Sequence, residues 1–160
     1  MFPRLFGAIF LFYAAACTAE EAPSNDRLTL IIGPYVYHYH HNPEHNNKPW
    51  LTGLEWEPQN FWLDFGAVYF RNSFNQPSLY AYAGKRWFPG DNEQGFYLKL
   101  TAGPLYGYRG QYEDKVPFNH DGLAWAIIPG IGYQYRGVDA QFVFLGGAAL
   151  LFTFGYDFSK

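Results

Sequence analysis

The chain has 160 residues, a formal net charge of −3 and one cysteine, and 22% of its residues are aromatic. This length suits a single domain, and an acidic balance without a basic patch argues against nucleic acid as a partner. A high aromatic share at a mildly negative mean hydropathy argues against a bundle of membrane helices, which needs long apolar runs. It is typical of a barrel whose strands carry apolar residues at every second position.

The first 19 residues predict a secretory signal peptide. Arg4 supplies the charged start, residues 5–16 form an apolar segment too short to span a bilayer, and small residues follow up to position 19. Removing Arg4 leaves 10 basic against 14 acidic groups in the mature chain, residues 20–160, and a net charge of −4. The alternative is a lipoprotein with an acylated Cys17 as its first residue. Otherwise Cys17 leaves with the signal, and the mature chain has no thiol for disulfides or catalysis.

Alternating segments bounded by Gly, Pro, Asn and Asp predict eight strands. We expect them at residues 28–41, 49–57, 61–71, 78–88, 95–109, 122–136, 138–146 and 149–158. The connections 58–60, 89–94 and 136–137 are compact, whereas 42–48, 72–77 and 110–121 are longer and polar. This pattern predicts an all-β fold, a single eight-stranded antiparallel transmembrane β-barrel, with its longer loops outside and both termini on the periplasmic side.

The last strand carries the clearest barrel pattern. One face of its two-residue period is apolar and the other is mixed. The apolar face holds Leu150, Phe152, Phe154, Tyr156 and Phe158, and the mixed face holds Leu151, Thr153, Gly155 and Asp157. Such a strand near the chain's end resembles the closing strand of bacterial outer-membrane barrels, although a soluble β-sandwich is an alternative.

The same alternation assigns side chains to the lipid face or to the lumen. In the first strand we expect Tyr35, Tyr37 and Tyr39 to face lipid, because imidazoles suit a lipid boundary poorly. The opposite face then directs Pro34, Val36, His38 and His40 inward, and in the third strand Trp62 points inward too.

The residues expected inside fall into two tiers. The tier near the periplasmic end is polar, and its members can pair with one another: Asp64, Lys99, Gln134, Arg136, Asp139, Gln141 and Asp157. The tier near the outer end is apolar: Val36, Val68, Phe70, Gly103, Leu105, Gly107, Ala126, Ile128, Val143, Leu145 and Leu151. Since a barrel of this size holds side chains or one small ligand, the upper tier is either a hydrocarbon-binding site or a packed plug.

Two polar clusters are predicted at the outer rim. His38 and His40 end the first strand, and Asn72 and Ser73 follow the third. An imidazole beside a hydroxyl at a membrane surface can perform acyl transfer, with histidine as the general base and a hydroxyl or amide stabilising the oxyanion. A metal site built from His38, His40, His41 and His45 is one alternative, and histidines that only hydrogen-bond to the rim are another.

The chain resembles the PagP-type lipid A palmitoyltransferase family of outer-membrane acyltransferases. The resemblance rests on a histidine near the top of the first strand and on short motifs in a shared order. These motifs are Asn46-Asn47-Lys48-Pro49-Trp50, Arg71-Asn72-Ser73 and Ile128-Pro129-Gly130-Ile131-Gly132-Tyr133. It implies an eight-stranded barrel that moves an acyl chain from a phospholipid to lipid A in the outer leaflet, with the chain measured inside the upper barrel.

Carried over residue by residue, the family's essential histidine matches His38 or His40 and its serine matches Ser73. Its aspartate falls on Asn72, which cannot hold a negative charge beside an imidazolium. The resemblance therefore implies an acyltransferase, or alternatively a catalytically silent barrel that binds or transports a lipid or small apolar ligand. We expect no cofactor and no metal, a monomer, and membrane lipids as partners. The substrate-binding residues would be Val36, Val68, Phe70, Gly103, Leu105, Ile128 and Val143.

Overall fold

The structure, a computed structural model, describes residues 26–40, 42–43, 45–90 and 94–159; the predicted signal peptide with Cys17 lies outside them. Its strands are β1 (Arg27–His38), β2 (Leu51–Glu57), β3 (Asp64–Arg71), β4 (Pro77–Trp87), β5 (Gly95–Tyr106), β6 (Leu123–Tyr135), β7 (Val138–Leu145) and β8 (Ala149–Asp157). A short 3₁₀ helix, η1 (Gly110–Lys115), lies between β5 and β6. Each segment predicted as a strand corresponds to one of these strands.

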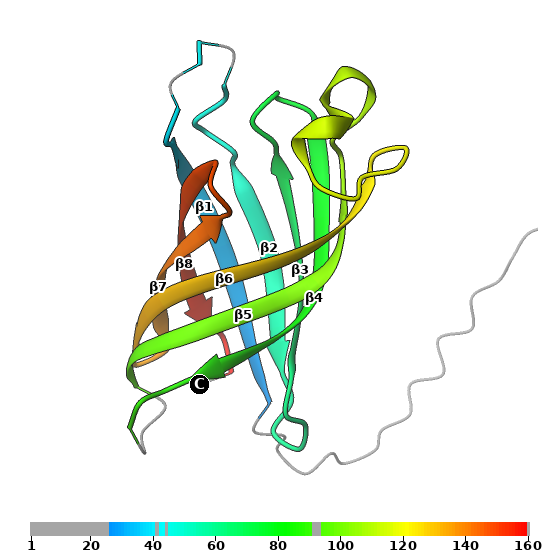
Figure 1. The fold of residues 1–160 in the computed structure, drawn as a ribbon. Coiled ribbons are helices and arrows are strands. Elements are labelled where there is room, and N and C mark those ends of the chain that lie inside the picture. Colours follow the sequence, from blue (N-terminus) through cyan, green and yellow to red (C-terminus); the bar gives the residue numbers. More distant parts are fainter. Residues whose placement is uncertain (1–25, 41, 44, 91–93, 160) are drawn as a thin grey trace, which may run out of the picture.

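The strands close into one antiparallel barrel in the order β1 to β8 (Figure 1). β8 pairs with β1, so that Tyr156 lies opposite Leu30. The connections β1–β2, β3–β4, β5–β6 and β7–β8 lie at one end, here called the upper end, and the remaining connections lie at the lower end with Arg27 and Asp157. The predicted all-β, eight-stranded antiparallel barrel is therefore confirmed, as is the placement of the longer loops at one end.

A register shift in β1 changes the face assignment within that strand. The pairing of β1 with β8 is irregular between Ile32 and Tyr35. Thr29 is buried before the irregularity and Val36 after it, so the inward parity switches from odd to even numbers. Pro34 is exposed, and its prediction as an inward residue is wrong because proline lacks the N–H that a regular ladder needs and favours bulges. Val36 faces inward as predicted.

Two other predicted inward residues lie outside the strands. Trp62 precedes β3 and is exposed, with the Lys85 ammonium 5.9 Å from its ring centroid. Arg136 and Gly137 form the β6–β7 turn with φ angles of 49° and 83°. Positive φ at both positions is the geometry of a two-residue hairpin whose twist matches its strands. Arg136 therefore lies over the Tyr135 ring instead of entering the lumen.

The outside of the barrel is covered with large apolar and aromatic side chains. On β8 Phe154 and Tyr156 are exposed, while Thr153 and Asp157 are buried, as the alternation predicted. Other strands continue the exposed set with Leu28, Ile32, Tyr35, Tyr37, Leu54, Trp56, Phe65, Tyr69, Leu98, Leu100, Ile127, Ile131, Tyr133 and Phe142. In the described part of the chain, no helix has the length and apolarity that crossing a bilayer requires.

Candidate functional site

The upper half of the barrel encloses an apolar cavity of about 490 Å³, a volume in the usual range for small-molecule sites. Leu51, Leu145 and Leu151 contribute to its wall. Six of the seven residues predicted to bind substrate also line it: Val36, Val68, Phe70, Leu105, Ile128 and Val143. The upper tier is therefore a cavity and not a fully packed plug.

Gly103 is the predicted lining residue that does not belong to this wall. A Cβ built on Gly103 would lie 2.0 Å from the Ala81 carbonyl oxygen and 2.8 Å from the Tyr82 Cα. The glycine therefore permits the backbones of β4 and β5 to approach closely, which no other residue could do without displacing a strand. The sequence could not predict this contact, because parity predicts the direction of a side chain but not its distance to the neighbouring backbone.

The cavity ends below on a floor of hydrogen-bonding side chains. The Tyr80 hydroxyl donates to Thr101 Oγ1 at 3.0 Å, and the rings of Tyr80 and Tyr82 stack with centroids 5.1 Å apart. Lys99 and Gln141 also reach the cavity from below. An apolar ligand would gain free energy down to this level and lose it beyond, because buried polar groups would have to give up partners.

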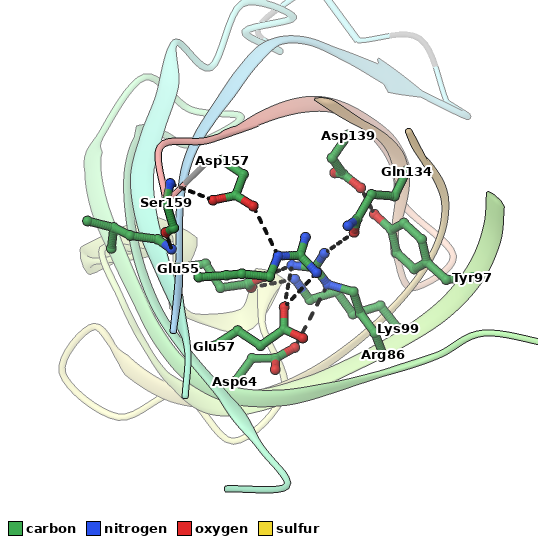
Figure 2. Close-up of polar contacts among 12 residues, drawn as sticks. Glu55, Glu57, Asp64, Arg86, Tyr97, Lys99, Gln134, Asp139, Asp157 and Ser159 are labelled. Carbon is green, nitrogen blue, oxygen red and sulfur yellow. Dashed lines mark hydrogen bonds and ion pairs between the residues drawn. The ribbon is translucent and has the colours of Figure 1, made fainter. Parts of the chain in front are cut away.

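Beneath the floor, a polar network crosses the barrel (Figure 2). Glu55, which is only 1% exposed, forms ion pairs with both Arg86 and Lys99. Its carboxylate also accepts a hydrogen bond of 2.6 Å from Tyr82. Since Lys99 lines the upper cavity and Arg86 lines a lower cavity of about 360 Å³, Glu55 lies between the two spaces and joins their walls.

The rest of the network surrounds Arg86 and confirms the predicted polar lower tier. Arg86 donates to Gln134 Oε1 at 2.6 Å, and Tyr97 donates to Asp139. At the lower mouth the Arg27 Nε atom lies 3.2 Å from Asp157 Oδ2. The sequence reasoning named Asp64, Lys99, Gln134, Asp139 and Asp157 but missed Glu55, Arg86, Tyr82 and Tyr97. Alternation in β2, β4 and β5 carries the missing signal: exposed Leu54 and Trp56 flank Glu55, for example.

At the upper rim the structure brings His38 and Ser73 together. His38 ends β1, and Ser73 lies in the turn after β3, yet His38 Nε2 lies 2.8 Å from Ser73 Oγ. This distance confirms the prediction that the two rim clusters meet across β2. Ser73 also lines the apolar cavity, so an imidazole and a hydroxyl in hydrogen-bond contact stand at its mouth.

The other ring nitrogen of His38 contacts the β1–β2 loop. His38 Nδ1 lies 2.8 Å from Asn47 Oδ1. Main-chain hydrogen bonds hold this part of the loop on both sides, from Val36 N to the Asn47 carbonyl at 3.0 Å and from Asn46 N to the Ser73 carbonyl at 2.7 Å. Asn47 belongs to one of the motifs noted in the sequence, but its contact with His38 could not be predicted, because the contact depends on how the loop folds back.

Asn72 is buried and holds the turn that presents Ser73. Its Oδ1 accepts hydrogen bonds from the main-chain N–H groups of Phe74 and Gln76, at 2.9 and 3.0 Å. Its Nδ2 lies 3.3 Å from the Gly107 carbonyl oxygen, to which it donates. An amide fits this position better than a carboxylate, which would face the carbonyl with a second acceptor. The structure therefore shows Asn72 hydrogen-bonded within the turn that presents Ser73, and His40 is exposed beyond the end of β1.

Aromatic rings cover the site from the side of the loops. His45 packs against His38 with ring centroids 4.5 Å apart, and Phe74 stacks on Tyr112 at 3.9 Å. Tyr108, just beyond β5, is hydrogen-bonded to Ser73. Burial raises the pKa of the Tyr108 hydroxyl, and the hydrogen bonds with Ser73 offset part of this increase. Gly107, with φ 140°, redirects the chain immediately before Tyr108.

The cavity also opens through the barrel wall between β6 and β7. Their ladder runs from Gly130, opposite Val143, to Tyr135, opposite Val138. β6 continues upward to Leu123 beyond this ladder, and it diverges there from β7 (Figure 1). Trp125, Ile127 and Phe144 are exposed on the outside and still line the cavity. A ligand could therefore enter from the side of the barrel as well as from its rim.

Among the described residues, no group of three or more His, Cys, Asp or Glu side chains is arranged to hold a metal ion. Protein-family models and curated protein sequences give no match to the chain.

Proposed function

We infer that the protein is an outer-membrane acyltransferase, which moves a fatty acyl chain from a phospholipid to lipid A in the outer leaflet. The observation that carries this proposal is the His38–Ser73 contact of 2.8 Å at the mouth of the apolar cavity. General bases act on hydroxyl groups at this distance, and the cavity offers an acyl chain a place next to them.

The outer surface of the barrel supports the membrane location. Soluble monomers rarely expose apolar patches that extend over a whole surface. Here exposed tyrosines and tryptophans, among them Tyr35, Trp56 and Tyr133, accompany exposed leucines and isoleucines around the barrel. Aromatic rings with polar edges suit the two boundaries of a bilayer, and aliphatic side chains suit its interior.

The opening between β6 and β7 supports a lipid donor. In a membrane this gap would face the acyl chains of neighbouring lipids, and Trp125 and Ile127, 71% and 72% exposed, would line the entrance. A phospholipid could insert one chain into the cavity without leaving the bilayer. Its ester carbonyl would then stand near the rim, where His38 and Ser73 lie.

The test is mass spectrometry of lipid A after incubation with purified protein in micelles that also contain phospholipid. We expect one added acyl chain with the natural sequence and with His120→Ala, whose imidazole is 94% exposed and does not line the cavity. His38→Ala should lower the rate by about 100-fold or more. Lipid A of unchanged mass with correctly folded protein would contradict the proposal.

A second candidate is a catalytically silent barrel that holds a lipid or another apolar ligand. It is favoured by Asn72, which stands where the resembled family has an aspartate and is committed to the turn through Phe74 and Gly107. Native mass spectrometry distinguishes the two: a silent barrel would keep an intact phospholipid bound, whereas the acyltransferase would release a lysophospholipid when lipid A is present.

A further inference from the structure

We propose that Ser73 is a covalent acyl carrier. His38 activates its hydroxyl as a general base, and Asn47 positions His38. The inference rests on the proposed acyl-transfer function and specifies its mechanism. Three side chains stand in line, with Asn47 Oδ1 at 2.8 Å from His38 Nδ1 and Ser73 Oγ at 2.8 Å from His38 Nε2. This order of nucleophile, base and orienting group is the arrangement that activates hydroxyl nucleophiles on unrelated folds.

Asn47 determines which nitrogen of His38 can act as the base. An amide oxygen only accepts hydrogen bonds, so its contact places the imidazole proton on Nδ1. Nε2 then carries the free electron pair and accepts the Ser73 hydroxyl proton. An amide bears no charge and stabilises the resulting imidazolium less than a carboxylate does, so this arrangement predicts a slower reaction than a carboxylate would give.

Main-chain contacts hold the three residues in register before any substrate binds. Val36 N donates to the Asn47 carbonyl two residues before His38, and Asn46 N donates to the Ser73 carbonyl. The side chains therefore lie on three segments of the rim, and the β1–β2 loop is hydrogen-bonded directly to both of the others. A site fixed in this way avoids much of the entropic cost of assembling a nucleophile and its base.

The acyl transfer then proceeds in two balanced halves. Ser73 Oγ attacks the ester carbonyl of the phospholipid while its proton moves to His38 Nε2. The carbon–oxygen bond to the lysophospholipid breaks, and the departing oxygen takes the proton from His38, which leaves an acyl ester on Ser73. In the second half a hydroxyl group of the acceptor gives its proton to His38 and attacks this ester, so that Ser73 Oγ departs and recovers the proton.

The cavity favours this sequence over a direct transfer between the two lipids. Ser73 lines the same space as Val36, Val68 and Leu105, so an acyl chain on Ser73 can stay in the apolar wall while the lysophospholipid leaves. The acceptor can then occupy the rim that the first lipid has vacated. A single site can thus serve two large lipids in turn.

The test uses p-nitrophenyl palmitate as an acyl donor with the purified, full barrel in detergent micelles and without acceptor. We expect a burst of p-nitrophenol equal to the amount of protein, and intact-protein mass spectrometry should show one palmitoyl group on the peptide that contains Ser73. Ser73→Ala should abolish both. Ser73→Cys should retain acylation as a thioester, from which hydroxylamine releases the acyl group. An acylated Ser73→Cys variant would show that Ser73→Ala fails because it lacks the nucleophile and not because it misfolds.

Asn47 is tested through the rate of the burst. Asn47→Leu should slow acylation by roughly 10-fold to 100-fold while Asn47→Asp, which keeps the accepting oxygen, should restore it or exceed the natural rate. A purely structural role in the loop would leave the burst rate unchanged in Asn47→Leu. His120→Ala serves as the control, with an unchanged burst.

The outcomes separate this inference from the function it rests on. Acylated Ser73 together with unmodified lipid A would support Ser73 as the acyl carrier and overturn only the assignment of lipid A as the acceptor. Acylated lipid A without a burst, and without a trapped acyl group in the natural protein or Ser73→Cys, would overturn the covalent carrier and leave His38 as a base acting on the acceptor directly.

Discussion

Replacing Glu55 with glutamine tests the polar network beneath the cavity floor. Glu55 is 1% exposed. Its carboxylate forms ion pairs with Lys99 and Arg86 and accepts a hydrogen bond of 2.6 Å from the Tyr82 hydroxyl. Glutamine has nearly the same shape and can still accept from Tyr82. The substitution therefore removes the negative charge and leaves the packing almost unchanged.

The expected loss follows from what the two cations keep. Arg86 retains the Gln134 amide oxygen at 2.6 Å and carboxylate oxygens of Glu57 and Asp64, each at 3.9 Å. Lys99 retains the Tyr82 ring, whose centroid is 5.7 Å from its ammonium. Removing one partner of a buried ion pair costs about 3–5 kcal/mol, and we expect the loss to fall in this range mainly because of Lys99.

The measurement is the free energy of unfolding in phospholipid vesicles, from urea titrations followed by tryptophan fluorescence. Asp114→Asn, an exposed acid in η1, is the matched control and should stay within about 0.5 kcal/mol of the natural protein. The double variant Glu55→Gln, Lys99→Met should lose less free energy of unfolding than the sum of the two single variants, because it contains no buried Lys99 ammonium without its carboxylate partner. A Glu55→Gln barrel within about 1 kcal/mol of the natural one would refute the reasoning.

Three further substitutions test the turn, the glycine contact and the cavity. Asn72→Asp should not raise acyl transfer to lipid A, and should cost about 1–3 kcal/mol because its carboxylate would face the Gly107 carbonyl. Gly103→Ala should prevent refolding in vesicles, whereas Gly147→Ala, which meets open space, should refold normally. Ala126→Phe should fill the cavity and favour shorter acyl chains, at about 0.8 kcal/mol for each methylene displaced; unchanged chain selectivity in a folded variant would place the acyl chain elsewhere.

The barrel could be predicted because its information is local. Alternating side chains and turn residues each act within a few positions, so eight strands and their order follow without knowledge of distant contacts. The errors lie where this assumption fails. Pro34 sits at a register shift that reverses parity, and Trp62 and Arg136 belong to turns that trim the predicted strands.

The candidate site was predicted only in part, for a related reason. That His38 and Ser73 meet follows from strand order alone, because β1 and β3 both pair with β2. Asn47 and Tyr108 reach them through loops, whose paths depend on particular main-chain contacts such as Asn46 with Ser73. Sequence periodicity says nothing of such paths, so the residue that orients the imidazole could be found only from the structure.

The two tiers of the lumen give the proposed reaction its direction. Glu55 ties the wall of the upper cavity to that of the lower one, and Tyr80 with Thr101 closes the floor above it. An acyl chain can therefore enter only with its methyl end toward the floor, because the polar network would lose partners to any longer insertion. The ester carbonyl is then left at the rim, next to Ser73 and His38. The floor thus limits the methyl end of the acyl chain, and the nucleophile meets its carbonyl end. Substitutions in the floor should therefore alter the preferred acyl-chain length, and substitutions at the rim should alter the rate of transfer.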